Sequence, residues 1–90
     1  MLTLPGELVH ATANQALLVL TPALESVAET QVTVDASPLT RFDSTALAVC
    51  LALRRVAERA GKSLVWQGVP PRLADLAKLY GIAELLPAPA

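Results

Sequence analysis

The sequence predicts a small α/β fold, in which a mixed, mostly parallel sheet of about four strands is covered by helices. Two observations predict this class. Short runs rich in β-branched residues alternate along the chain with longer apolar runs of helical period, and Pro or Gly stands between most of these runs. The 90 residues contain no linker, repeat or low-complexity segment, so we expect a single domain over residues 1–90.

The first half of the chain should supply two strands and a helix. Leu2 and Leu4 alternate with Thr3 before Pro5-Gly6, which is typical of a short strand ended by a turn. Thr12 is a candidate N-cap for a helix that Pro22 should kink or restart. The apolar residues at helical spacing in this segment are Ala16, Leu17, Leu20 and Leu24. The β-branched run from 32 to 36 predicts a central strand.

The second half continues the alternation. An apolar helix should follow Asp43-Ser44 and end at Gly61, a residue that suits a left-handed C-cap. The run 63–67 predicts another strand, with Leu64 and Trp66 on its buried face. Pro71 suits the first turn of a last helix closed by Gly81, on which Tyr80 should pack against the sheet. The remaining tail is long enough for one turn or an edge strand.

Composition excludes several classes of function. Seven Lys and Arg oppose eight Asp and Glu, so the net charge of −1 supplies no excess of cations for a nucleic-acid backbone. The single cysteine, Cys50, forms no internal disulfide, and no secretory leader or apolar run of bilayer length is found. We therefore expect a soluble, cytoplasmic protein.

A helical wheel divides the helix after Ser44 into two faces. Charged residues gather on one side: Arg54, Arg55, Glu58 and Arg59. The opposite side should face the sheet: Ala46, Val49, Cys50, Leu53, Val56 and Ala57. Leu47, Ala48 and Leu51 then fall on the charged side, beside Ser44 and Thr45. They are either scattered exposed apolar residues or an apolar patch with a polar rim, which is typical of a protein-binding surface. The position beside the polar helix start favours the interface.

Catalysis is not expected. A serine nucleophile at position 44 needs a nearby base and an oxyanion hole, but His10 is the sole histidine and no Gly-x-Ser-x-Gly elbow occurs. Neither a metal-ligand cluster nor a Gly-rich phosphate loop is present in the sequence. We therefore expect no cofactor and no metal. On residues alone, Ser44 or Asp43 is an N-cap, and loss of such a cap costs about 1 kcal/mol.

The order of motifs resembles a known family. A strand ending in Val34-Asp35, a loop to Asp43-Ser44-Thr45 and an apolar helix resemble the STAS domain, the fold of anti-sigma-factor antagonists. The motifs Gly6-Glu7-Leu8, 64–68 and 76–81 (LAKLYG) look like those of the MlaB group, cytoplasmic STAS subunits of Mla phospholipid-transport ABC complexes.

This resemblance implies a non-catalytic subunit that binds the transporter's MlaF-like ATPase, within a complex with a membrane permease that maintains outer-membrane lipid asymmetry. The protein would then lie at the inner membrane through its partner, with no nucleic acid bound and no membrane insertion of its own. The alternative is an anti-sigma-factor antagonist with a kinase as its partner. Ser44 matches the phosphorylated position of the antagonists, so it is a candidate phosphorylation site.

The expected partner-binding residues combine the wheel with the resemblance. They are Asp43, Ser44, Thr45, Leu47, Ala48, Leu51, Arg55, Arg72, Lys78 and Leu79. Two departures from the family pattern stand out. Thr45-Ala46 replaces the glycine that usually follows the hydroxyl residue, and the chain begins at what looks like the family's second strand. An edge of the sheet is therefore expected to be open, or to be covered by a partner.

Overall fold

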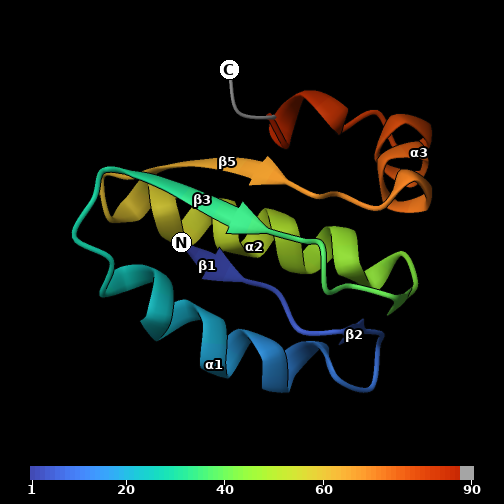
Figure 1. The fold of residues 1–90 in the computed structure, drawn as a ribbon, viewed down its shortest axis with the longest axis horizontal. Coiled ribbons are helices and arrows are strands. Elements are labelled where there is room, and N and C mark those ends of the chain that lie inside the picture. The colour runs from blue at the N-terminus through green and yellow to red at the C-terminus, as the bar shows by residue number, and fades with distance from the viewer. Residues whose placement is uncertain (88–90) are drawn as a thin grey trace.

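Three parallel strands form the central sheet of the computed structural model, which describes residues 1–87. They are β1 (Leu2–Thr3), β3 (Gln31–Asp35) and β5 (Ser63–Gln67), in the order β1-β3-β5 (Figure 1). In their register, Val34 lies opposite both Leu2 and Trp66. The predicted parallel α/β class is confirmed, and the predicted strand 63–67 has the bounds expected of it.

A second, two-stranded parallel ladder lies beside this sheet. It pairs β2 (Glu7–Leu8) with β4 (Arg41–Phe42). Neither strand was predicted, because two residues carry no readable period and the pairing joins segments far apart in the sequence. The ladder buries Leu8 and Phe42, and so holds the chain just before Asp43 against the body of the protein.

Helices α1 (Ala13–Glu25) and α2 (Thr45–Arg59) contact each other and the sheet. Figure 1 shows α2 crossing behind the sheet and α1 lying alongside β1. The alternation of the strands explains this layering. Val32, Val34, Leu64 and Trp66 are buried between less buried neighbours, so one face of each strand supplies the core.

The sequence predicted a kink or a restart at Pro22 and a cap at Thr12. The helix does not restart at Pro22 but runs on to Glu25. Pro22 is exposed, so its ring lies toward water. Proline has no N–H to donate to the carbonyl oxygen one turn earlier, and water can solvate that oxygen instead. The Thr12 hydroxyl does not cap α1 either. It accepts a hydrogen bond from the Val9 N–H at 3.1 Å and also donates to the Val9 carbonyl, closing the preceding turn instead.

The last elements are α3 (Pro71–Leu79) and the 3-10 turn η1 (Ala83–Leu85). Gly61 and Gly81 follow α2 and α3 with φ of 71° and 73°. The sequence predicted helix ends at both glycines, because glycine lacks the Cβ atom that clashes in the left-handed region. The Trp66 N–H donates to the Pro87 carbonyl at 2.8 Å, so one backbone group on the outer edge of β5 is paired. None of the helices within residues 1–87 is long and apolar enough to cross a membrane.

Candidate functional site

The start of α2 is held in place by the carboxylate of Asp43. Its Oδ1 accepts a hydrogen bond from the Thr45 N–H at 2.8 Å, and its Oδ2 accepts one from the His10 N–H at 3.3 Å. The hydrogen bonds from Thr45, followed by the backbone bond and charge of His10, hold the pKa of Asp43 below its ordinary value. The ionised carboxylate therefore ties the β2–α1 loop to the first turn of α2.

Ser44 occupies the N-cap position but does not act as a cap. Its backbone is already helical (φ −62°, ψ −18°), and its side chain makes no capping hydrogen bond. The Asp43 carboxylate takes the Thr45 N–H instead. A cap at Ser44 was thus the wrong alternative, and Asp43 was the right one. The consequence is an exposed Ser44 hydroxyl that the fold does not use within the described residues.

A shallow hollow of about 350 Å³ opens beside Ser44, between the first half of α2 and the end of α3. Its lining consists of Ser44, Leu47, Ala48, Leu51, Tyr80 and Ile82. Four of these residues were predicted to form one surface, and the structure brings them together. The hollow contains no charged residue among those six, so it suits apolar side chains of a partner.

The depth of Leu47 differs from the prediction. Leu47 was placed on the exposed side of α2, but it is only 4% exposed, whereas Ala48 is exposed and Leu51 is half-buried. The reason is tertiary, because Leu47 joins the hydrophobic core, against which Ile82 from the segment after α3 also packs. Leu47 thus forms the floor of the hollow, while Ala48 and Leu51 form its accessible wall.

Sequence reasoning missed Tyr80 and Ile82 as site residues. The i, i+3, i+4, i+7 pattern placed Tyr80 on the sheet, but the helix ends at Leu79 and the Tyr80 side chain is 58% exposed. The Gly81 reversal was the signal that could have corrected this, since a residue next to a left-handed glycine no longer follows the helical wheel.

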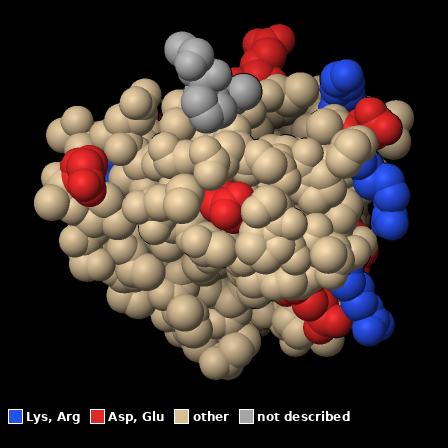
Figure 2. Space-filling view, viewed as in Figure 1, with Lys and Arg blue, Asp and Glu red and all other residues tan. Residues whose placement is uncertain are grey.

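The remaining predicted residues flank the hollow or lie apart from it. Arg55 is exposed one turn beyond Leu51, and Leu79 is 78% exposed. The Arg72 guanidinium lies 5.1 Å from the centre of the Phe42 ring, just before Asp43 in the chain. Lys78 lines a different hollow, next to Trp66. In the view of Figure 2, Lys and Arg side chains gather along one edge, on the side of α3, and the middle of the face carries little charge.

Within residues 1–87, no general base is hydrogen-bonded to the Ser44 hydroxyl. No hydrogen bond joins its hydroxyl to the His10 imidazole within residues 1–87, although the backbone of His10 is held at Asp43. Burial raises the pKa of the Cys50 thiol to about 12, which keeps it protonated. Among the described residues, no group of three or more His, Cys, Asp or Glu is placed to hold a metal ion.

Comparisons with known proteins agree with this architecture. A solved structure of the anti-sigma factor antagonist SpoIIAA in its unphosphorylated form has a TM-score of 0.72, 19% sequence identity, and a match covering 98% of this chain and 76% of that one. At this identity the likeness shows the fold alone. No curated protein matched the sequence. The family model described as "Mlab, STAS domain" matches residues 1–87, and the chain therefore belongs to this family of STAS domains.

Proposed function

We propose that this protein is a non-catalytic STAS subunit that binds the ATPase of an ABC-type phospholipid transporter through the hollow between α2 and α3. Membership of the Mlab family supports the kind of partner. The observation that carries the proposal is the hollow itself, because it places apolar groups next to an exposed, unused hydroxyl at a helix start.

The energetics of the hollow favour a protein partner. Tyr80 and Leu79 are 58% and 78% exposed, so docking removes apolar surface from water at both residues. Aromatic residues at the centre of such a patch often dominate binding. Ser44 and Tyr80 each add a hydroxyl that can hydrogen-bond a partner at the rim. The surface thus combines an apolar centre with polar groups that fix orientation.

Nearby cations supply a preference for acidic partner residues. Arg55 and Arg72 are exposed on α2 and α3, the two helices on either side of the hollow. Arg55 makes no ion pair within residues 1–87, whereas its neighbour Arg54 is bound to Glu58 at 2.8 Å. An acidic residue of the ATPase placed against Arg55 would accelerate association and set the register of docking.

Co-purification tests this proposal. Affinity-tagged protein should retain the ATPase and the permease of its transporter. Tyr80→Asp should release them, because docking of the partner would bury the new carboxylate beside Leu47, Leu51 and Ile82. Leu18→Asp is the matched control, since Leu18 is 71% exposed on α1, outside the hollow. Equal retention by the wild type and both variants would remove the hollow from the interface.

The exposed Ser44 hydroxyl favours a second candidate, an anti-sigma-factor antagonist regulated by phosphorylation. A phosphate at the start of α2 would be favoured by the helix dipole, but it would stand next to the ionised Asp43 and at the rim of an apolar hollow. Phosphorylation would thereby release the partner. Recovery of an anti-sigma kinase in place of an ATPase, with phosphate incorporation lost in Ser44→Ala, would identify this alternative.

A further inference from the structure

The hollow next to Trp66 has a volume of about 430 Å³ and shares no lining residue with the hollow beside Ser44. The end of β5 and the turn after it contribute Trp66, Gly68 and Val69, and α3 contributes Ala74, Ala77 and Lys78. In Figure 1, α3 and η1 lie on the β5 side of the sheet. Small-molecule sites usually have volumes of about 300–1,000 Å³, so this hollow has the size of a ligand site.

Most of the surface of this hollow is apolar. Ala74 and Ala77 line it from α3, and Ala83 and Leu86 line it from the segment after α3. Because an alanine side chain is small, three alanines at these positions leave space that larger side chains would fill. Transfer of an apolar group from water into such a space is favourable. The hollow is therefore suited to the apolar part of a ligand.

The Trp66 indole carries a hydrogen-bond donor that the fold does not use. Trp66 is 2% exposed, and its buried Nε1–H has no partner within residues 1–87. It is the only buried side-chain nitrogen or oxygen of these residues without one. A buried indole N–H usually finds an acceptor, and an orphaned donor of this kind calls for a ligand atom or an ordered water. An acceptor held in the hollow that Trp66 lines can supply the missing bond.

Other groups around the hollow are donors as well. Neither the Gly68 nor the Val69 N–H donates a backbone hydrogen bond within residues 1–87. Lys78 is exposed, makes no ion pair in the same range, and is the only charged residue among the described residues that line the hollow. An ammonium and several N–H groups without acceptors favour an oxygen ligand with negative charge. The hollow thus combines an apolar surface with a demand for an anionic acceptor.

We propose that this hollow binds a small apolar carboxylate, whose apolar part packs on Ala74, Ala77 and Leu86 and whose carboxylate accepts hydrogen bonds from Lys78 and the Trp66 indole. A carboxylate is ionised at neutral pH and has two acceptor oxygens, so it can serve both donors. Its single negative charge matches the single cation. A phosphate monoester carries a charge of about −2 at pH 7, of which Lys78 would balance only half. The proposal does not depend on an ATPase partner, because the two hollows share no residue.

NMR titration of the full chain with sodium octanoate tests the ligand class. Trp66 is the single tryptophan, so its indole N–H gives one cross-peak in a proton–nitrogen correlation spectrum. Octanoate should move this cross-peak downfield in a saturable way, with a Kd of about 1 mM or tighter. Acetate lacks the apolar part and octanol lacks the charge, so each should bind at least roughly tenfold more weakly. Octyl phosphate, with its second negative charge, should not bind more tightly than octanoate.

Substitutions at Lys78 test the site. Lys78→Met should weaken octanoate binding at least roughly tenfold, and Lys78→Arg should retain it, because the arginine keeps the charge. Arg59→Met is the matched control, since it removes an exposed cation of α2 that lies outside the hollow. Ala83 is exposed, so Ala83→Leu should fold normally, yet it should also weaken binding by narrowing the hollow.

Four results would overturn the proposal. The first is an absence of octanoate binding up to about 10 mM. The second is saturable binding that leaves the indole cross-peak in place. The third is equal binding by Lys78→Met and Arg59→Met. The fourth is tighter binding of octyl phosphate than of octanoate, because the site would then select a dianion.

Discussion

At the start of α2, Asp43 and Ser44 divide two tasks between adjacent residues. The Asp43 carboxylate fixes the local backbone by accepting hydrogen bonds from the Thr45 and His10 N–H groups. The Ser44 side chain makes no capping hydrogen bond. A residue whose side chain is exposed and structurally idle can be changed or modified without loss of stability. The hydroxyl is therefore available for a partner or a phosphate.

This division predicts opposite outcomes for two neighbouring alanine substitutions. Ser44→Ala should leave the melting temperature unchanged while impairing the function of the assembled complex, because it removes a contact with the partner and no cap. Asp43→Ala should lower the melting temperature, because the Thr45 and His10 N–H groups lose their acceptor. Thermal unfolding followed by circular dichroism measures both. A clear loss of stability in Ser44→Ala would mean that its hydroxyl caps α2 in solution.

At the scale of elements, most signals carried within one segment were read correctly from the sequence, with Thr12 and Pro22 of α1 as the exceptions. The strand 63–67, the Gly61 and Gly81 helix ends and Pro71 at the start of α3 each depend on local pattern or backbone freedom. The buried side of α2 was also predicted, including Val49, Cys50 and Leu53. These features follow from residues that lie within a few positions of one another.

Features that depend on distant segments were not read correctly. The β2–β4 ladder joins Glu7 to Arg41, and neither two-residue strand carries a period of its own. Leu47 was assigned to the exposed side because the wheel describes one helix and takes no account of the rest of the core, which buries Leu47. The candidate site was thus predicted in its centre, at Ser44, Ala48 and Leu51, but not in the wall that α3 contributes.

The different depths of two side chains on α2 can be tested directly. Leu47→Ala should lower the free energy of unfolding by about 2–5 kcal/mol, the usual range for a buried leucine, because Leu47 is 4% exposed. Ala48→Asp, one residue later and exposed, should leave stability nearly unchanged and still weaken partner binding. Urea denaturation of both variants gives the comparison. Equal losses of stability would show that the wall of the hollow is part of the core.

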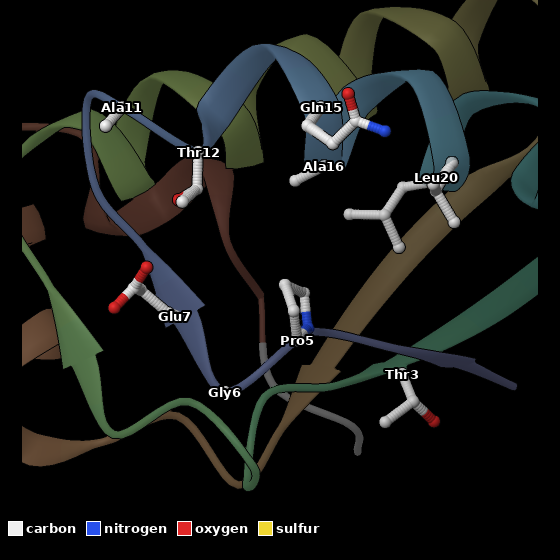
Figure 3. Close-up of a pocket in the computed structure, with 10 residues that line it drawn as sticks. Thr3, Pro5, Gly6, Glu7, Ala11, Thr12, Gln15, Ala16 and Leu20 are labelled. Atoms are coloured by element: carbon white, nitrogen blue, oxygen red, sulfur yellow. The ribbon is translucent and has the colours of Figure 1, made fainter.

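At the scale of the whole molecule, the hollow beside Ser44 shares no lining residue with a second, larger hollow. The first lies between α2 and α3, and the second lies between α1 and β1 (Figure 3). Figure 1 places α1 and α3 at different ends of the structure. Between them stands a filled core in which Leu24 and Leu53 are fully buried. The core therefore separates the hollow between α2 and α3 from the hollow beside α1.

A change in the second hollow should leave binding at the hollow beside Ser44 unaffected. Perturbations that share no partner residue and lie well apart usually add within roughly 0.5 kcal/mol, and no residue lines both hollows. Val19→Asp changes an exposed residue of the hollow between α1 and β1, and it should therefore leave the affinity for the ATPase unchanged. Titration calorimetry of the wild type and of this variant with the ATPase measures this. A shift of tenfold or more would instead reveal coupling, with the direct packing of α1 on α2 as its physical route.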